Sequence, residues 1–450
     1  MSDAPLIISV SGLRGVVGKS LTPAVAMDFV RAFSRNLPDG PILVARDGRT
    51  TGPMLADVVS SGLAAMGRQV LHVGVAATPT VGVLVKTQRA AGAVQISASH
   101  NPPEYNGIKL FGGDGRVLTA DIGAKVADAY RAGTDVWADY RDVKTAESIV
   151  DTISEHLNAV LATVDVPRIR ECQFTALLDS NHGAGAVMGR PLLEALGCRV
   201  VINGEEPTGL FAHPAEPTAE NLASVLQKVR EAKANVGFCQ DPDADRLAVV
   251  DENGRYIGEE YTLALCLDHR LRQQTGTVVA NCASSRMSQD ITERLGGKFL
   301  RSKVGEANVA DLMISEDAVY GGEGNGGPID PRVGYVRDSF VAMAQILDAM
   351  SARQMPISQL ADELPRYEIH KSKTVVPADQ TAAALTAVRE HFSEAESSEL
   401  DGLRLDWPGR WLLVRASNTE PIVRIICEDS DIEKAKAVCE ETANVIQMLL

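Results

Sequence analysis

Three aspartates at alternate positions are the first residues whose types and spacing point to chemistry. Asp241, Asp243 and Asp245 lie in the stretch QDPDADRLAVVDE, residues 240–252. On extended backbone, alternate side chains face the same way, so the three carboxylates would converge. Like charges that close repel one another unless a cation joins them, and all-oxygen ligands suit a hard ion. The spacing predicts one Mg²⁺ per chain, and Arg246 beside it indicates an anionic ligand.

Two other interpretations of this loop stay open at this point. An EF-hand calcium loop would explain Glu252, which falls at loop position 12. However, position 6, where that loop needs glycine, holds Arg246, and the flanks NVGFC and LAVV are typical of strands and not of helices. The other alternative is a solvated acidic turn without a ligand. An arginine directly after the aspartates argues against it.

A second polar segment, ISASHNPPEYNGIKLF at residues 96–111, combines a hydroxyl, an imidazole and an ammonium. The apolar run AGAVQI before it is typical of a strand, and in α/β sheets ligands bind beyond the carboxyl ends of strands. The proline pair disfavours a helix near Ser99, and an Asn106-Gly107 turn is expected to fold Lys109 back. Ser99 and Lys109 could thus act as nucleophile and proton carrier. The alternative is a turn serine and a surface lysine.

The elements that must position these loops alternate between strands and helices along most of the chain. Short β-branched runs predict strands, and amphipathic stretches between them predict helices. Strands separated by helices predict βαβ units and mixed, mostly parallel sheets. The expected strand–helix–strand rounds are residues 41–47, 54–67 and 69–75, then 174–180, 189–197 and 198–203, then 276–282, 291–297 and 298–302.

The last stretch has a different pattern. LRLDWPGRWLLVRAS at 403–417 and PIVRIICED at 421–429 predict two neighbouring strands with a loop between them, and residues 432–450 predict an amphipathic helix. We therefore expect an α/β protein with three related α/β domains and a C-terminal α+β domain. The expected domains are residues 1–150, 151–252, 253–367 and 368–450.

The composition limits the class of protein. The chain has 450 residues, of which 45% are hydrophobic, which is enough for several packed domains. Its net charge of −15 opposes nucleic acid and anionic lipid. The sequence has no apolar run of about 18 residues, its acidic start is unlike a signal peptide, and its seven cysteines form no C-x-x-C pair. We expect a cytoplasmic monomer or homodimer that binds neither nucleic acid nor membranes.

Several short motifs occur along nearly the whole chain in a characteristic order. SASHNPPEYNGIKLF and DPDADR are followed by GEGNGG at residues 322–327 and by RASNTEPIVRI at 415–425. SGLRGVVG near the N-terminus and GLFAHPAEPTAENL at 209–222 fit the same series. Together they resemble the α-D-phosphohexomutase superfamily, which contains phosphoglucomutases, phosphomannomutases and phosphoglucosamine mutases. The resemblance implies four domains around a central cleft.

The resemblance also implies a role for each polar group of the two loops. In the family, the serine of SHNP carries a phosphoryl group, which maps to Ser99, and Mg²⁺ is held by this phosphoserine and the three aspartates. Lys109 matches the family's general base. A lysine with a pKa near neutrality requires desolvation or neighbouring cations, and Arg14 would supply such a cation. His100 is a second candidate acid or base, with orientation of the loop as its alternative role.

The remaining motifs imply the contacts to sugar and phosphate. Many family members read G-E-x-S-G-H in the sugar-binding loop, whereas here Asn325 and Gly327 replace the serine and the histidine, so the family's sugar preference does not carry over. Arg415 and the turn after it suit a phosphate, because they offer guanidinium, hydroxyl, amide and backbone donors. The predicted substrate-binding residues are Arg246, Lys303, Glu323, Asn325, Arg415, Ser417, Asn418, Thr419 and Arg424, with Glu306 near Lys303.

The activity implied is the interconversion of hexose 6-phosphate and hexose 1-phosphate. Ser99 would lend its phosphoryl group to the sugar, and a hexose bisphosphate would serve as intermediate and activator. The GEGNGG loop with SKVGEANV upstream favours glucosamine phosphate, and glucose and mannose phosphates are the alternatives. Two other classes compete: a sugar-phosphate phosphatase, which would lack a separate phosphate-binding loop, and a non-catalytic sugar-phosphate sensor, which would have lost some of the catalytic residues.

Overall fold

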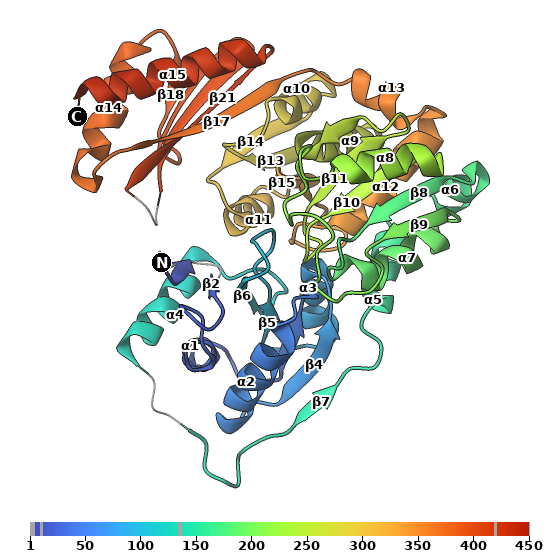
Figure 1. The fold of residues 1–450 in the computed structure, drawn as a ribbon, viewed down its shortest axis with the longest axis vertical. Helices are drawn as coiled ribbons and strands as arrows, with labels where there is room; N and C mark the ends of the chain where they lie inside the picture. Colours follow the sequence, from blue (N-terminus) through green and yellow to red (C-terminus); the bar gives the residue numbers. More distant parts are fainter. Residues whose placement is uncertain (1–4, 10–11, 134–136, 418–420, 450) are drawn as a thin grey trace.

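The structure is a computed structural model that describes residues 5–9, 12–133, 137–417 and 421–449. Within these residues the chain forms four β-sheets covered by helices, and each sheet is built from a separate stretch of the sequence. Figure 1 shows the first unit at the bottom, the second and third side by side above it, and the C-terminal unit at the upper left. The predicted α/β class with a different last domain is confirmed.

The first sheet has seven strands in the order β1-β2-β6-β5-β3-β4-β7. β5, β3, β4 and β7 are joined by parallel pairing, whereas β6, β2 and β1 extend the sheet through antiparallel pairs. The strands are β1 (Ile7–Ser9), β2 (Gly12–Val16), β3 (Ile42–Arg46), β4 (Val70–Val75), β5 (Gly92–Ile96), β6 (Tyr105–Gly112) and β7 (Ala146–Ser148). The helices are α1 (Pro23–Arg35), α2 (Gly52–Ala65), α3 (Thr78–Thr87) and α4 (Ala120–Ala132).

The second and third sheets are smaller mixed sheets, with the orders β12-β11-β10-β8-β9 and β14-β13-β15-β16. The second contains β8 (Thr175–Asp179), β9 (Arg199–Asn203), β10 (Val236–Gln240), β11 (Leu247–Asp251) and β12 (Tyr256–Gly258), with α5 (Ser154–Leu161), α6 (Val166–Cys172), α7 (Gly185–Ala195) and α8 (Ala223–Ala232). The third contains β13 (Thr277–Asn281), β14 (Lys298–Ser302), β15 (Tyr320–Glu323) and β16 (Gly327–Ile329), with α9 (Glu259–Gln273), α10 (Met287–Arg294), α11 (Glu306–Ser315), α12 (Ser339–Arg353) and α13 (Ile357–Asp362).

The C-terminal sheet is antiparallel throughout, in the order β17-β21-β20-β19-β18. Its elements are β17 (Glu368–Val375), α14 (Thr381–His391), β18 (Glu396–Ser398), β19 (Leu403–Trp407), β20 (Arg410–Ala416), β21 (Ile422–Asp429) and α15 (Ile432–Leu449), with a short 3₁₀ turn at Ala378–Gln380. One prediction was wrong here. Residues 403–417 form a hairpin and not a single strand, because Pro408 and Gly409 make a turn between β19 and β20.

One feature repeats in the three α/β units and places the predicted site loops. In each, a strand that pairs in parallel on one side is followed by an antiparallel neighbour: β5 by β6, β10 by β11, and β15 by β16. The loops between these strands carry Ser99, the three aspartates and the GEGNGG motif. The RASNTEP motif likewise joins the antiparallel pair β20 and β21. The first three motifs therefore occupy equivalent connections, whereas the fourth lies between two strands of an antiparallel sheet.

Buried contacts bind the first three units together. Phe238 of β10 and Phe340 of α12 belong to one apolar cluster that spans the second and third units. Asp338 begins α12 by accepting hydrogen bonds from the next backbone amides, and its carboxylate also lies 2.8 Å from His156. His156 in turn lies 2.9 Å from Thr80 of the first unit. Buried hydrogen-bond networks of this kind are costly to break, so they hold the three units that carry the site in a fixed arrangement.

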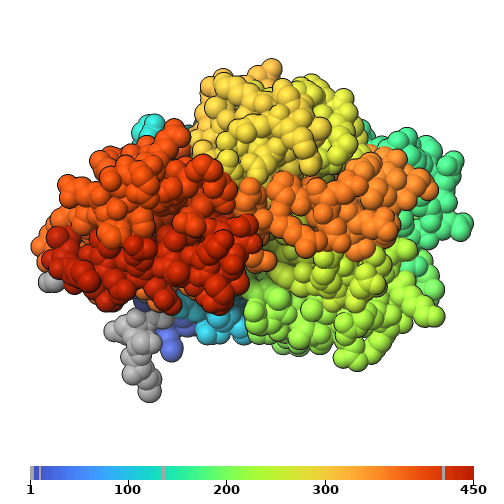
Figure 2. Space-filling view, turned by 90° about the horizontal axis from the view of Figure 1, so that it is seen from above, coloured from blue at the N-terminus to red at the C-terminus, as the bar shows by residue number. Residues whose placement is uncertain are grey.

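The C-terminal unit is attached mainly to the third unit. Trp411 and Leu413 of β20 pack on Cys282, and Glu428 of β21 accepts a hydrogen bond from the backbone amide of Arg286. Figure 2 shows this unit, in red and orange, on one side of the molecule beside the yellow third unit. In the described part of the chain, no helix combines the length and the apolar character needed to cross a membrane.

Candidate active site

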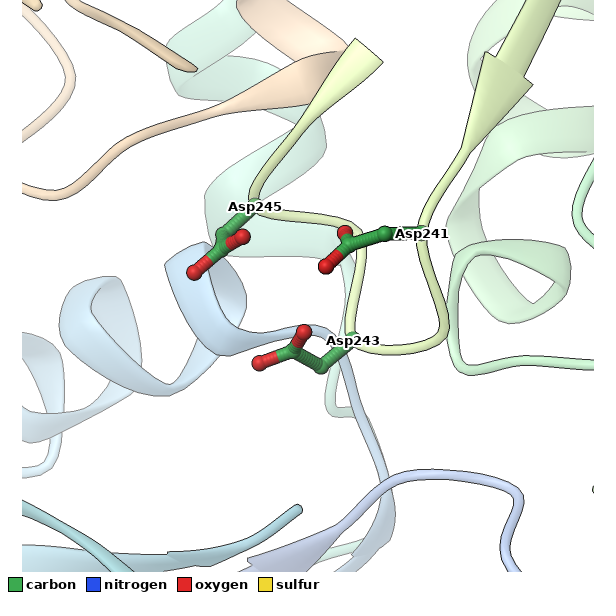
Figure 3. Close-up of side chains that lie close together, drawn as sticks. All are labelled: Asp241, Asp243 and Asp245. Atoms are coloured by element: carbon green, nitrogen blue, oxygen red, sulfur yellow. The ribbon is translucent and has the colours of Figure 1, made fainter. Parts of the chain in front are cut away.

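The three predicted metal ligands converge in the loop between β10 and β11. Asp241, Asp243 and Asp245 are fully buried, and one carboxylate oxygen from each lies within 4.8 Å of the others. Figure 3 shows the three side chains pointing toward one another from a curved loop. The convergence was predicted, but its cause was not alternation along extended backbone. The loop turns back on itself, with Ala244 in the left-handed region at a φ of 55°.

Two buried cations partly neutralise the trio. The Lys109 ammonium donates to Asp243 Oδ2 and, at 2.9 Å, to Asp245 Oδ2. The Arg337 guanidinium donates to the same oxygen of Asp245 at 2.6 Å. Burial raises the pKa of Asp243 and of Asp245, but the neighbouring cations outweigh burial and lower both values. For Asp241, burial and the two neighbouring carboxylates raise the pKa well above its ordinary value. Asp243 and Asp245 are thus the ionised members of the trio, and Lys109 and Arg337 lie against them.

The donor set fits a hard divalent cation. Oδ1 of Asp243 and Oδ1 of Asp245 are buried without a hydrogen-bond partner among the described residues. Buried carboxylate oxygens without a donor are unfavourable, and a cation bound among them would remove that cost. All the available ligand atoms are oxygens, which Mg²⁺ prefers. The flanks of the loop are antiparallel strands, which the EF-hand alternative does not allow.

Ser99 lies directly against this trio. Its side chain is 1% exposed, and its Oγ donates to Asp241 Oδ2 at 2.7 Å and lies 3.3 Å from His100 Nδ1. Ser99 has a φ of 50°, a conformation that residues other than glycine seldom adopt. Strained backbone of this kind persists only where the surroundings impose it. The serine predicted to carry phosphate is therefore held at the predicted metal site.

Arg49 imposes this conformation, and the sequence analysis missed it. Its guanidinium donates to the carbonyl oxygens of Ser99 and Asn101, both at 2.6 Å, and also to two carbonyls farther along the loop. Arg49 is fixed in turn by Asp47, which also accepts from Ser97 Oγ at 2.7 Å. Burial raises the pKa of Asp47 to about 6. The available signal was the RDGRTTG stretch that follows β3, since ligands gather at the carboxyl ends of such strands.

Lys109 reaches the trio from a strand and not from a turn. Asn106 and Gly107 are part of β6, so the predicted turn at that dipeptide was wrong, and the reversal lies in the residues before it. Burial lowers the pKa of Lys109, but Asp243 and Asp245 outweigh burial and raise it above its ordinary value. The expected pKa near neutrality is therefore not found in this structure, where Lys109 is a cation.

His100 and Arg14 lie at the same end of the site as Ser99. Burial, together with the charges of Arg246 and Arg14, lowers the pKa of His100 to about 3, so its imidazole is neutral. Arg14 extends from β2, and its guanidinium donates to Asn101 Oδ1 at 3.3 Å. Burial lowers the pKa of Arg14 from its ordinary value, while Asp243 opposes that shift. Both residues lie where the predicted phosphoryl group would be transferred.

A cleft joins this end to the C-terminal unit. A cavity of about 730 Å³ is lined by predicted residues from four different stretches, namely Arg14, Lys109, Lys303, Arg415, Ser417 and Arg424. Arg415 forms an ion pair with Asp401 at 3.2 Å, and the backbone amide of Ser417 donates to the carbonyl of Ile422. Asn418 and Thr419 lie outside the described residues. The structure thus brings Arg415, Ser417 and the predicted catalytic groups Arg14 and Lys109 to one cavity.

A second cavity of about 640 Å³ shares Arg415, Arg424 and Glu323 with the first and extends to His100 and Arg246. Arg424 of β21 pairs in register with Lys373 of β17 on one side and with Arg415 of β20 on the other. Three cationic residues therefore lie in one row across three neighbouring strands. Lys373 was missed, although the alternation of lysines in HKSKT, which is typical of one face of a strand, was a signal.

The GEGNGG loop is anchored by Glu323. Its carboxylate accepts from Asn281 Nδ2 at 2.7 Å, from the backbone amide of Gly305 at 3.0 Å and from Arg337 at 2.8 Å. Arg337 therefore connects the sugar loop to the aspartate trio, and its backbone amide also donates to Glu306. Arg337 was missed as well. The available signal was its place in the sequence, because Arg337 directly precedes Asp338, the residue that caps α12.

Comparison with known proteins follows the same order of domains. Phosphoglucomutase/phosphomannomutase models match in four consecutive stretches: alpha/beta/alpha domain I at residues 6–136, domain II at 154–254, domain III at 259–367 and the C-terminal domain at 373–445. A protein of Thermococcus kodakarensis named "Probable phosphoglucosamine mutase" is 34% identical over 442 residues, which cover 97% of each chain. The chain belongs to the phosphoglucomutase/phosphomannomutase family. The resemblance drawn from the motifs is confirmed.

Other members of this family differ in the sugar that their names give. A second Thermococcus kodakarensis protein, named phosphoglucomutase/phosphomannomutase, is 36% identical over 439 residues, covering 95% of this chain and 96% of its own. The crystal structure of a phosphoglucomutase/phosphomannomutase family protein from Burkholderia thailandensis superposes with a TM-score of 0.83 at 25% identity, covering 98% of both chains. N-acetylphosphoglucosamine mutase of Aspergillus fumigatus, in complex with GlcNAc-6P and magnesium, shares the fold at a TM-score of 0.53 and 14% identity over 95% of this chain and 99% of its own.

Proposed function

We propose that this protein is a Mg²⁺-dependent phosphohexomutase that moves a phosphoryl group between the 6- and 1-positions of a hexose, with glucosamine phosphate as its preferred substrate. The observation that carries the proposal is the 2.7 Å contact between Ser99 Oγ and Asp241 inside the buried trio. Phosphoryl transfer needs a positioned oxygen beside groups that stabilise negative charge. The phosphosugar substrates of the family support the same class of reaction.

The reaction has two halves that use the same serine. In the first, a sugar hydroxyl oxygen forms a bond to the phosphorus on Ser99 while the bond from phosphorus to Oγ breaks, which leaves a hexose bisphosphate. In the second, Ser99 Oγ takes the other phosphoryl group and the bond to its sugar oxygen breaks. Mg²⁺, held by Asp241, Asp243, Asp245 and a phosphoserine oxygen, would neutralise charge on the transferred group. The bisphosphate has to turn over in the cleft between the halves.

Lys109 is the proposed acceptor of the proton that leaves the sugar hydroxyl. It keeps its own proton in this structure because Asp243 and Asp245 outweigh burial. A divalent cation bound to those carboxylates would offset their charge, so that burial and the nearby Arg337 and Arg14 would lower the pKa of Lys109. His100, neutral and 3.3 Å from Ser99 Oγ, is the second candidate and can orient the serine as well.

The non-reacting phosphate is proposed to bind the row formed by Lys373, Arg424 and Arg415, together with the turn that starts at Ser417. A fixed handle at this position lets binding energy from the far phosphate orient the reacting end. Arg415 suits the role because a guanidinium can hold two phosphate oxygens. Arg246, Lys303, Glu323 and Asn325 are proposed to contact the sugar or its phosphates from the other walls.

A coupled assay comparing glucosamine 6-phosphate, glucose 1-phosphate and mannose 1-phosphate tests the proposal. We expect turnover that requires Mg²⁺, is lost with EDTA, and has the largest kcat/KM for glucosamine 6-phosphate. A larger kcat/KM for glucose or mannose phosphate would favour the alternative that the second Thermococcus relative represents. Release of inorganic phosphate without the isomer would indicate a phosphatase, and binding without either product would indicate a sensor.

Several finer expectations belong to the same proposal. The domains are proposed to divide as 1–150, 151–252, 253–367 and 368–450, and a hexose bisphosphate is proposed to prime Ser99. We further propose a cytoplasmic monomer or homodimer that binds neither nucleic acid nor membranes. Size-exclusion chromatography with light scattering would determine the oligomeric state.

A further inference from the structure

The second cavity contains acidic groups that the proposed phosphate contacts do not use. Glu259 and Glu260, at the start of α9, and Glu216, from the loop before α8, line it together with the cations of the C-terminal sheet. The acids come from the second and third units, whereas Lys371, Lys373, Arg415 and Arg424 come from the last. Arg246 of the second unit also lines the cavity, but most of its cations enter from the last unit, so the cavity suits a ligand that carries both a cation and an anion.

Two acceptors in this cavity have no donor within the described part of the chain. Glu259 Oε1 and Asn325 Oδ1 are both buried without a hydrogen-bond partner. Each belongs to a residue that lines the cavity, one on α9 and the other in the GEGNGG loop. A buried acceptor without a partner is unfavourable, and native proteins keep few of them. A ligand that donates hydrogen bonds to both would satisfy them.

The helix start alone does not explain the two glutamates. Acidic side chains are common in the first turn of a helix, where they favour its positive end. Glu260 has a further structural partner, since it accepts from the backbone amide of Ser285 at 2.9 Å. Glu260 also lies against the sugar loop, because a Cβ on Gly324 would stand 1.9 Å from its Oε2. Glu259 also has an unpartnered oxygen, and it lines the same cavity as Gly324 and Asn325 of that loop.

We propose that Glu259 and Asn325 form a subsite for the ammonium group of a 2-amino-2-deoxyhexose phosphate. The Glu259 carboxylate supplies the charge, and the Asn325 carbonyl supplies a second acceptor. A hexose with a hydroxyl at the same position can donate to these atoms but brings no positive charge, so it binds more weakly. This inference rests on the proposed function and names the feature that selects the amino sugar.

The test measures binding in a protein that cannot transfer phosphate. Calorimetry on the Ser99→Ala full-length chain, with Mg²⁺, compares glucosamine 6-phosphate, glucose 6-phosphate and N-acetylglucosamine 6-phosphate. We expect glucosamine 6-phosphate to bind on the order of tenfold tighter than the other two, because neither of them brings a positive charge to pair with the Glu259 carboxylate. Adding Glu259→Gln should remove this preference while changing the Kd for glucose 6-phosphate by less than about threefold.

A matched control and a second variant keep the result interpretable. Glu293→Gln makes the same change on the exposed face of α10, away from both cavities, and should leave the preference intact. Asn325→Ala should reduce the preference by about threefold, since it removes an uncharged acceptor. Equal Kd values for the three sugars in Ser99→Ala, or a preference that survives Glu259→Gln, would overturn the subsite. A wild-type protein that shows the binding preference but no isomerisation would instead overturn the proposed function.

Discussion

At the Ser99 end of the cleft, Ser99 is 1% exposed, the three aspartates are fully buried, and each is hydrogen-bonded within the protein. At the C-terminal end Lys303 and Arg424 are exposed, and they face a cavity of about 730 Å³. The first region is rigid and densely partnered, whereas the second leaves its cations open to a ligand. Fixed polar groups stabilise charge that develops in a transition state. A substrate that must turn over between two half-reactions needs a cavity with room to rotate.

The way the units are attached supports this contrast. The first three are tied together by a shared apolar cluster and by the buried Thr80–His156–Asp338 chain. The C-terminal unit contacts the third through a small cluster around Trp411. Substitutions at the two ends should therefore have different signatures, with loss of kcat at the first and loss of substrate affinity at the second.

Asp243→Asn should have the largest effect. It removes a charge from the proposed metal site, so we expect kcat to fall by about 10³-fold or more and Mg²⁺ binding to be lost. The coupled assay and calorimetry with Mg²⁺ measure these changes, and circular dichroism should show an unchanged fold. Asp57→Asn, on the exposed face of α2, is the matched control. Turnover within tenfold of the wild type would mean that this carboxylate is not needed.

Arg49→Lys tests whether the conformation of Ser99 matters. An ammonium cannot reproduce the guanidinium contacts to four carbonyl oxygens. We expect kcat to fall by about 10- to 100-fold and the rate of Ser99 phosphorylation by hexose bisphosphate to fall with it. The exposed Arg35→Lys serves as control. If phosphorylation proceeds at the wild-type rate, the loop does not depend on Arg49.

Arg415→Gln should act at the other end of the cleft. We expect KM for the phosphosugar to rise by about tenfold with kcat changed by less than about threefold, because a remote phosphate contact is lost. Steady-state kinetics separate the two constants. Arg410→Gln on the same strand lines neither cavity and should behave as wild type. A fall in kcat alone would contradict the assignment of this end to binding.

The smallest expected effect is a pH dependence of the sugar preference. Burial raises the pKa of Glu259 to about 7, with Arg246, Lys371 and Arg337 opposing that shift and Glu216 adding to it. The carboxylate is ionised above that pH and protonated below it, so the share of the preference that depends on Glu259, which is the difference between wild type and Glu259→Gln, should shrink as the pH falls from about 8 to 6. Burial raises the pKa of Glu260 to about 8, so that group ionises only at the upper limit. Ratios of kcat/KM across this range provide the measurement, with Glu259→Gln as the control that retains the titration of the sugar's own amine and phosphate.

The sequence predicted the loops that carry chemistry because their residues lie close together along the chain. Ser99 with Lys109, and the three aspartates, are each contained in one short segment, and both segments meet in the structure. The strand and helix pattern also predicted the three α/β units and their mixed sheets. Local turns were predicted less well. The sequence WPGR makes a hairpin turn inside a stretch predicted as one strand, and the NG dipeptide, which was predicted to turn, lies within β6.

The supporting residues could not be found in the same way. Arg49 acts on carbonyls about 50 positions away, and Arg337 reaches an aspartate 92 positions away. Such contacts depend on how the units pack, and a single arginine in a polar loop carries no pattern that distinguishes it from a surface charge. The raised pKa of Lys109 could not be predicted for the same reason. It depends on how far Asp243 and Asp245 outweigh burial, and these effects exist only in the folded site.

Intact-mass spectrometry with phosphopeptide mapping tests the central claim most directly. After incubation with hexose bisphosphate and Mg²⁺, the wild-type chain should carry one phosphoryl group on Ser99, and adding hexose monophosphate should transfer it to the sugar. The Ser99→Ala chain should gain none and should not turn over. A phosphoryl group at another residue, or full turnover by Ser99→Ala, would contradict the account.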